Sequence, residues 1–394
     1  MPDVPLPFTR EEYATRLAKV RSAMDAADIE VLVATDPSNM AWLTGYDGWS
    51  FYTHQAVIVS HDDDPRWWGR MQDANGARRT VYMDESRIVG YADDYVQSTE
   101  IHPHQNLAGF LKEFGHETSR IGVEKDNYYY SAAAHEHLTA GLPDATFLDA
   151  TGLVNWRRAV KSERELEYMR AAARIVERAH ERVLELVEPG LRKNELVAEI
   201  FRTSIRGVDG YGGDYPAIVP LLPTGPDASA PHLTWDDRPF EKGAGTFFEL
   251  AGCVRRYHTP LSRSIYLGTP PQEMLNAEKA LVEGLEAGLE AARAGNRASD
   301  VAAALYASLD RSGIKREGRC GYPIGLSYPP DWGERTISFR LTDVTVLEAG
   351  MTFHFMPGLW MRDWGLEITE SILIKESGPA EPLTNSPRRL FVKP

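Results

Sequence analysis

Residues 247–252 read Phe-Phe-Glu-Leu-Ala-Gly, and residues 257–264 read Tyr-His-Thr-Pro-Leu-Ser-Arg-Ser. The first stretch is apolar except for one carboxyl, that of Glu249, which stands between Phe248 and Leu250. A buried unpaired charge is costly, so a glutamate inside an apolar strand is either paired or functional. Burial also raises the pKa of a carboxyl, which suits the group for proton transfer. Glu249 is therefore our first candidate for a catalytic residue.

The segments on either side of these stretches predict an α+β domain over residues 156–394. Ser162 and Glu165 form a capping-box pattern, and the amphipathic helix that they begin should end at Pro189-Gly190. Further helices fit residues 194–205, 271–294 and 298–309, and strand-like runs cover residues 217–222, 246–250, 261–267, 351–356 and 366–375. Helices outside and antiparallel strands inside are typical of this class.

Residues 1–155 predict a smaller α/β domain, because helix and strand signals alternate along them. A helix should follow the capping pattern of Thr9 and Glu12, and short strands fit residues 29–35, 56–59, 81–83 and 120–123. Residues 61–79 mix acidic, aromatic and turn-forming side chains, and we interpret them as a loop.

Composition limits the classes of partner. The chain has 394 residues and a formal net charge of −14, and a chain this acidic is repelled by nucleic acids and by anionic membrane surfaces. Its two cysteines, Cys253 and Cys320, are too few for a disulfide framework or a thiolate metal cage. No apolar run is long enough to span a bilayer, and the first residues lack the pattern of a signal peptide. We expect a cytoplasmic protein with no nucleic-acid or membrane partner.

Several segments together resemble the pita-bread hydrolase family, which includes methionine aminopeptidase, aminopeptidase P, prolidase and creatinase. These segments are residues 231–232, 241–252, 257–264, 321–326, 346–358 and 366–374. In that family one strand carries Asp-x-Gly, and eleven positions after its Asp a second Asp begins Asp-x-Thr-Arg. Here Glu249 takes the first position, Pro260 takes the second, and Arg263 stands where the family has its arginine. The resemblance implies a C-terminal pita-bread, creatinase-like domain.

The metal ligands of that family are missing at the matching positions. The resemblance carries the family's two Asp, one His and two Glu over to Glu249, Pro260, Tyr322, Met356 and Thr369. Hard divalent ions need several oxygen or imidazole ligands that converge on one point, and only Glu249 supplies a strong one. We therefore predict no metal ion and no cofactor, and we reject a metal-dependent peptidase.

Two interpretations remain for such a chain. One is a catalytically inert pita-bread domain that serves as a binding module. The other is a metal-free hydrolase that has kept the pocket. We favour the hydrolase because a carboxyl survives at Glu249, and because His232 lies in the Pro-His segment that in this family carries a substrate-facing histidine. A carboxyl with an imidazole is a minimal acid/base or nucleophile/acid pair.

The substrate should carry a positive charge at its electrophilic carbon, because no metal ion is expected to polarise it. Amidinium and guanidinium groups meet this condition, pair with carboxylates and suit aromatic walls. The predicted substrate-binding residues are Trp49, Tyr52, Gln72, Asp73, Tyr257, His258, Tyr322, Phe355, Trp360 and Glu367. By the resemblance to creatinase, Gln72 and Asp73 would reach the site from the first domain of a partner subunit, which implies a homodimer.

Within the family, residues 67–77, 247–253, 256–263 and 387–393 resemble the ectoine hydrolases. That resemblance implies a cytoplasmic homodimer that opens the cyclic amidine of ectoine, a small zwitterion, to N-acetyl-2,4-diaminobutyrate. It leaves open whether hydroxyectoine is accepted and whether a downstream deacetylase binds. Glu249 would attack the amidine carbon or deprotonate the attacking water, and His232 would protonate the leaving nitrogen. A creatinase-type amidinohydrolase is the alternative, since both substrates carry a charged carbon between nitrogens.

Overall fold

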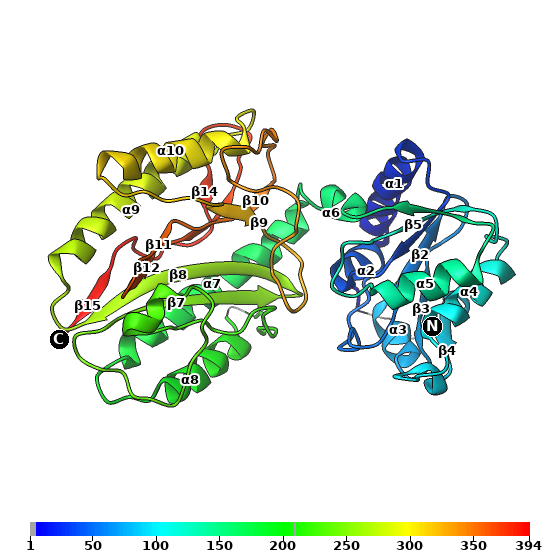
Figure 1. Ribbon diagram of the computed structural model, residues 1–394, viewed down its shortest axis with the longest axis horizontal. Coiled ribbons are helices and arrows are strands. Elements are labelled where there is room, and N and C mark those ends of the chain that lie inside the picture. Colours follow the sequence, from blue (N-terminus) through cyan, green and yellow to red (C-terminus); the bar gives the residue numbers. More distant parts are fainter. Residues whose placement is uncertain (1–4, 209) are drawn as a thin grey trace. The chain divides into compact units, whose positions relative to one another are not determined.

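Residues 5–208 and 210–394 are described by a computed structural model (Figure 1). The chain divides into a first unit, Met1–Arg158, and a second unit, Ala159–Pro394. The boundary that we predict after residue 155 lies three residues before this division. No helix in the described part of the chain is long and apolar enough to cross a membrane.

The first unit is a mixed six-stranded sheet in the order β4-β3-β2-β1-β5-β6, with helices on both faces. Its strands are β1 (Val31–Ala34), β2 (Ala56–Ser60), β3 (Arg66–Arg70), β4 (Ile88–Tyr91), β5 (Arg120–Val123) and β6 (Thr146–Asp149). Its helices are α1 (Arg10–Ala26), α2 (Pro37–Thr44), α3 (Ala74–Thr80), α4 (Pro103–Glu113), α5 (Ala132–Gly141) and α6 (Leu153–Arg157), with 3-10 turns at Glu85–Arg87 and Asp93–Tyr95.

Side chains alternate between two cores along the strands of this sheet. Leu32 and Ala34 of β1 pack in one core with residues of α1, α2 and α3, whereas Val31 and Val33 pack in the other with residues of α4 and α5. Successive side chains of a strand point to opposite faces, so a strand covered on both sides is apolar throughout. The predicted α/β organisation of this region is what the structure shows.

The predicted loop at residues 61–79 is wrong. The segment contains β3 and most of α3, and its two tryptophans are fully buried. Trp67 packs in the core beneath α1 to α3, and Trp68 packs in the opposite core. Two adjacent apolar residues show no period of two, so the pattern did not reveal that each one faces a different core.

The second unit pairs helices with curved sheets. Its helices are α7 (Glu163–Leu186), α8 (Lys193–Arg206), α9 (Gln272–Ala291) and α10 (Ala298–Arg311), with a 3-10 turn at Gly225–Ser229. Its strands are β7 (Gly245–Val254), β8 (Tyr257–Leu267), β9 (Gly321–Pro323), β10 (Thr352–Phe355), β11 (Gly358–Trp360), β12 (Gly365–Glu367), β13 (Glu370–Leu373), β14 (Glu381–Pro382) and β15 (Phe391–Lys393). They form sheets in the orders β15-β8-β7, β14-β13-β10-β9 and β11-β12.

Two helix pairs enclose these sheets, as Figure 1 shows. Helices α7 and α8 cover the long β7–β8 hairpin, and α9 and α10 cover β10, β12 and β13. The capping box at Ser162 forms as predicted and begins α7, because the Ser162 hydroxyl accepts from the Glu165 N–H while the Glu165 carboxyl accepts from the Ser162 N–H. The predicted strand at residues 217–222 is reduced to one isolated bridge, Leu221 with Glu249.

Candidate active site

The long hairpin fixes Glu249 on one face of the sheet. Glu249 of β7 pairs directly with Ser262 of β8, and its backbone N–H donates to the Leu221 carbonyl at 2.9 Å. The side chain is buried, with 7% of its surface exposed. Burial first, and the neighbouring carboxyl of Glu367 second, raise the pKa of Glu249 well above its ordinary value.

Glu367 forms a carboxyl pair with Glu249. The Ser264 hydroxyl of β8 holds the backbone of Glu367, accepting from its N–H at 2.9 Å and donating to its carbonyl at 3.0 Å. Burial raises the pKa of Glu367 to about 7, and the Ser262 hydroxyl and the charge of Arg316 counteract this only in part. Two buried carboxyls that repel each other share one proton near neutral pH. One carboxyl of the pair is therefore protonated and the other is ionised.

Polar atoms without protein partners gather around Glu367. Within the described residues, Glu367 Oε2 and Trp360 Nε1 are buried and make no hydrogen bond, and the buried Ser262 hydroxyl is near enough to Glu367 to lower its pKa but makes no hydrogen bond of good geometry. Trp360 lies beside Glu367, since a Cβ on Gly358 would lie 2.9 Å both from Glu367 Cγ and from Trp360 Cη2. Buried polar groups in native proteins are normally hydrogen-bonded, so this set is suited to a polar ligand.

A chain of hydrogen bonds crosses the site beside Glu249. Trp332 Nε1 donates to the Tyr322 hydroxyl at 2.8 Å, this hydroxyl lies 3.0 Å from His354 Nδ1, and His354 Nε2 lies 2.8 Å from Thr369 Oγ1. The Ser262 N–H donates to the same Thr369 oxygen at 2.7 Å. His354 Nδ1 is also 3.9 Å from Glu249 Oε1.

Burial favours the neutral forms of the two titratable members of this chain, His354 and Tyr322. Burial lowers the pKa of His354 to about 3, with the charge of Arg319 as a second cause. Burial and the charge of Glu249 raise the pKa of Tyr322 well above its ordinary value. The chain therefore offers Glu249 hydrogen-bonding neighbours but no countercharge.

These residues do not fit the pair of divalent ions that the fold family implies. The Tyr322 and Thr369 hydroxyls are committed to His354 and its neighbours, and Pro260 offers only a carbonyl, which accepts from the Ser371 hydroxyl at 2.6 Å. Among the described residues, Glu249 belongs to no group of three or more His, Cys, Asp or Glu whose ligand atoms converge. Several converging oxygen or imidazole ligands are the minimum for such ions.

The arginine of the family pattern, Arg263, is kept beside the positions that match the family's metal ligands. Arg263 of β8 pairs with Glu370 of β13 at 2.6 Å, and its Nη1 donates to the Thr369 carbonyl at 2.5 Å. Both side chains of the ion pair are fully buried. This contact fixes the segment that carries Glu367 and Thr369 against β8, where the Thr369 N–H also donates to the Ser262 carbonyl at 3.2 Å.

Three of the predicted substrate-binding residues of the second unit do not meet Glu249 directly. Tyr257 alternates to the other face of β8, where its hydroxyl donates to Glu165 of α7 at 2.7 Å. His258 shares the face of Glu249 but lies near the hairpin end, opposite Cys253, and its Nε2 accepts from the Ala217 N–H at 2.9 Å.

Phe355 faces the core of the second unit. Its ring lies against Gly288 of α9, where a Cβ would come within 2.3 Å of it. His354 precedes it on β10 and points to the opposite face, toward Tyr322 and Thr369. We predicted that the Phe355 ring would line the substrate site. Because side chains alternate along the strand, His354 is the residue of β10 that points to the site.

His232 is exposed in a turn that follows the 3-10 turn at Gly225–Ser229. No hydrogen bond or ion pair joins it to Glu249 within residues 5–208 and 210–394. Its role as a proton donor stays a prediction.

The remaining predicted residues belong to the first unit. Trp49 and Tyr52 are exposed, and the Trp49 ring lies 4.8 Å from the Phe51 ring. Gln72 is exposed, whereas Asp73 is half-buried at the start of α3, with its Oδ2 buried and without a hydrogen bond among the described residues. Burial raises the pKa of Asp73.

His354 and Ser262 are the site residues that the sequence pattern missed. His354 sits between Phe353 and Phe355, in the same apolar context that singled out Glu249. The rule that a buried polar side chain needs a partner or a function would have selected it. Ser262 carries no such signal, because serine is common in strands and loops alike.

Comparisons with known proteins agree with this fold. Residues 16–160 match the creatinase/prolidase N-terminal domain, and residues 167–376 match metallopeptidase family M24. The prolidase of Thermococcus sibiricus superposes with a TM-score of 0.83 at 18% identity, over 97% of this chain and 99% of that one. The predicted fold class, a pita-bread domain after a smaller α/β domain, is confirmed.

Curated relatives match along the whole chain. The ectoine hydrolase of Halomonas elongata is 60% identical over 100% of both chains. An uncharacterised hydrolase/peptidase of Sinorhizobium fredii is 42% identical over 98% of this chain and 99% of its own. The chain therefore belongs to metallopeptidase family M24, with the N-terminal domain of creatinases and prolidases in its first unit.

Proposed function

We propose that this chain hydrolyses the cyclic amidine ring of ectoine to N-acetyl-2,4-diaminobutyrate. The observation that carries the proposal is the buried carboxyl pair of Glu249 and Glu367, which has no bonded Lys or Arg among the described residues. A relative that is named ectoine hydrolase and is 60% identical over the full length supports the choice of substrate.

A cationic amidine supplies the positive charge that the pair of Glu249 and Glu367 lacks. The positive charge that the ring carbon shares with its two nitrogens favours ionised carboxylates beside it. Ionisation of Glu249 therefore becomes easier when the substrate is bound. The Trp360 ring, with its unpartnered Nε1, would contact the ring plane of the substrate.

Glu249 acts on the amidine carbon in one of two ways. It attacks directly and forms a covalent adduct that water resolves, or it takes a proton from the attacking water. Both routes consume one water, leave one oxygen on the amidine carbon and place two hydrogens on the former ring nitrogens. Neither route requires a metal ion, and the site residues do not fit one.

The leaving nitrogen needs a proton, and two residues are candidates. Our sequence prediction names His232. This residue is exposed and makes no hydrogen bond or ion pair with Glu249 among the described residues. Glu367 is the second candidate, since a carboxyl with a pKa of about 7 is protonated in part at neutral pH and is already buried beside Glu249. In the free site the shared proton lies on Glu249, whose pKa is raised more, so this assignment needs the bound amidinium to favour ionisation of Glu249 and leave the proton on Glu367.

We also propose a homodimer in which Trp49, Tyr52, Gln72 and Asp73 complete the site of the partner subunit. Asp73 supports this role, because its half-buried carboxyl keeps one oxygen without a hydrogen bond. Mixed dimers of inactive Glu249→Ala chains with inactive Asp73→Ala chains should recover activity, since each dimer then holds one intact site. Mixed dimers that form but stay inactive would place each site within one chain.

A direct assay separates the proposed function from its alternatives. The purified chain should release N-acetyl-2,4-diaminobutyrate from ectoine and should leave creatine unchanged, and hydroxyectoine can be scored in the same assay. Creatine turnover without ectoine turnover would instead identify an amidinohydrolase of the creatinase type. Binding of neither compound would indicate an inert binding module.

A further inference from the structure

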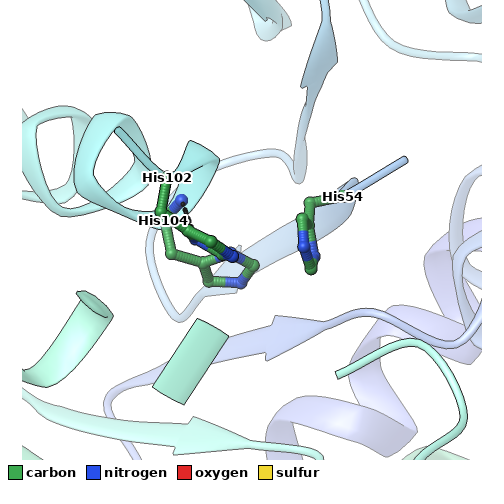
Figure 2. Close-up of side chains that lie close together, drawn as sticks. All are labelled: His54, His102 and His104. Atoms are coloured by element: carbon green, nitrogen blue, oxygen red, sulfur yellow. Dashed lines mark hydrogen bonds between the residues drawn. The ribbon is translucent and has the colours of Figure 1, made fainter. Parts of the chain in front are cut away.

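Three histidines come together in the first unit (Figure 2). His54 lies in the loop between α2 and β2, His102 is the N-cap residue of α4, and His104 lies in the first turn of that helix. One ring nitrogen from each histidine can be chosen so that all three lie within 4.8 Å of one another.

His104 is the unusual member of this group. Only 1% of its surface is exposed, and neither of its ring nitrogens has a hydrogen-bond partner within the described residues. A buried imidazole without partners is costly, and native structures normally satisfy such groups with protein, water or an ion. The ring is aimed at the other two histidines and lies 4.9 Å from that of His54, edge to face.

His102 has one ring nitrogen available. Its Nδ1 accepts the backbone N–H of His104 at 3.2 Å and so caps the helix, which leaves Nε2 unused by the cap. The ring of His137 stacks on His102 at 4.7 Å, with 11° between the planes. The Trp68 and Tyr130 rings, each 5.6 Å from that of His104, limit access of water from behind.

We propose that His54, His102 and His104 bind one divalent transition-metal ion of the zinc type. Imidazole is a ligand that zinc prefers, and three histidines with one water are a known coordination set. A point shared by three nitrogens this close lies within about 2.8 Å of each, and side-chain rotations would shorten this to the Zn–N distance of about 2.0–2.1 Å.

The surroundings suit this ion. A cavity of about 190 Å³, lined by His54, His102, Tyr95 and Ser98 among others, leaves room for the water that completes the coordination. Burial lowers the pKa of all three imidazoles, to about 4 for His102, so that protons do not compete for their lone pairs at neutral pH.

The bound ion would connect two segments that are far apart in the sequence. It would join the loop that carries His54, two residues after Tyr52, to the first turn of α4. The positive end of the helix dipole opposes a cation there, so we expect weaker binding than at a thiolate site. The inference depends on the first unit alone and does not rest on the proposed function.

Zinc titration of the metal-free full chain tests the inference. Calorimetry should show one site per chain, and His102→Asn should weaken binding at least about tenfold, since an Asn side chain keeps the helix cap but removes the ligand. His54→Gln should act in the same way. The half-buried His116, elsewhere in the first unit, provides the control, and His116→Gln should bind zinc as the unaltered chain does.

Thermal unfolding of the metal-free variants, measured in parallel, shows that each is folded. Cobalt(II) in place of zinc should give the visible absorption of a tetrahedral nitrogen site, and this absorption should disappear in His102→Asn. Absence of zinc binding to the unaltered chain would overturn the inference. Binding that both His54→Gln and His102→Asn leave unchanged would do the same, because the ion would then lie elsewhere.

Discussion

The two units of this chain each bury titratable side chains without a full set of partners, but the chemistry of the two groups is opposite. The second unit buries two carboxyls, Glu249 and Glu367, and burial raises the pKa of both, with the charge of Glu367 as a second cause at Glu249. The first unit buries imidazoles, led by His104, which burial holds neutral. The carboxyls suit a cationic substrate that enters and leaves, whereas the imidazoles suit the metal ion that we propose.

The second unit keeps the fold of the M24 metallopeptidases, although most of the matching ligand positions carry residues that do not suit divalent ions. In the second unit, the positions of three former ligands now carry Tyr322, Thr369 and Met356. Tyr322 and Thr369 bond to His354 instead of to an ion. Glu249 has no bonded Lys or Arg among the described residues, and under the proposed function a charged substrate would supply the countercharge.

The largest expected effect is at Glu249. Glu249→Gln should lower kcat by roughly 10³-fold or more, since an amide is neither nucleophile nor base. Glu249→Asp should fold and bind substrate but lose on the order of 100-fold, because the shorter side chain misplaces the carboxyl by about 1 Å. Steady-state kinetics on ectoine checks both. Near-normal turnover by a folded Glu249→Gln protein would make this carboxyl structural.

Glu367→Gln should change both the rate and the pH dependence of stability. As proton donor Glu367 would contribute roughly 10²–10⁴-fold to kcat. The folded protein keeps the Glu367 proton up to a pH of about 7, whereas the unfolded chain releases it near the ordinary value of 4.5. Stability of the unaltered chain should therefore fall as the pH rises through this window, by about 3 kcal/mol at most.

Urea unfolding at several pH values measures this difference. The unaltered chain should lose stability relative to Glu367→Gln between pH 4.5 and 7, the limits set by the ordinary and raised pKa of Glu367. The exposed Glu376 provides the control, and Glu376→Gln should follow the unaltered chain. Parallel curves for the unaltered chain and Glu367→Gln would mean that Glu367 is ionised in the folded protein.

His232→Asn tests which residue donates the proton. If Glu367 is the donor, kcat should fall less than about tenfold, a smaller loss than the 10²–10⁴-fold expected of a general acid. The pH profile of kcat should keep its shape, because the titrating groups remain in place. A loss of about 100-fold, with rescue by small amines, would assign the proton to His232 instead.

Tyr257→Phe should affect stability and leave turnover unchanged. The Tyr257 hydroxyl donates to Glu165 on the face covered by α7, and loss of this bond to a charged group should cost about 1–3 kcal/mol. Trp360→Phe is the matched change at the aromatic residue beside Glu367, and it should raise KM. Equal effects of the two changes on KM would place Tyr257 at the substrate.

The smallest effect is expected from chelation. Prolonged EDTA treatment should leave ectoine turnover intact, because the residues around Glu249 do not fit a metal ion. The same treatment of His102→Asn removes any contribution of the histidine site in the first unit. Activity that is lost in both proteins and restored by manganese, cobalt or zinc would contradict metal-independent chemistry.

The sequence predicted α1, the four helices of the second unit and the long hairpin, but it missed α2 to α6 and failed where a side chain's direction matters. Glu249 was identifiable because a charge in an apolar strand needs a reason. The sequence alone does not show which of the neighbours His354 and Phe355 points toward the site. That direction is set by the pairing of β10 with β9 and β13. The gathering of His54 with His102 and His104 likewise depends on how a loop folds against a helix, which no local pattern encodes.

The hydrogen-bonded chain from Trp332 to Thr369 has a consequence for how the site can present protons. Its two ends are occupied by fixed donors, Trp332 Nε1 and the Ser262 N–H. Two hydrogen bonds lie between these ends, one from Tyr322 to His354 and one from His354 to Thr369. Three hydrogens are available for them: the two hydroxyl hydrogens and the single N–H of the neutral imidazole. One of the three therefore always points out of the chain. One imidazole tautomer frees the hydrogen of Tyr322, and the other frees that of Thr369. A shift of tautomer therefore moves the outward hydrogen from one end of the chain to the other while every heavy atom stays in place.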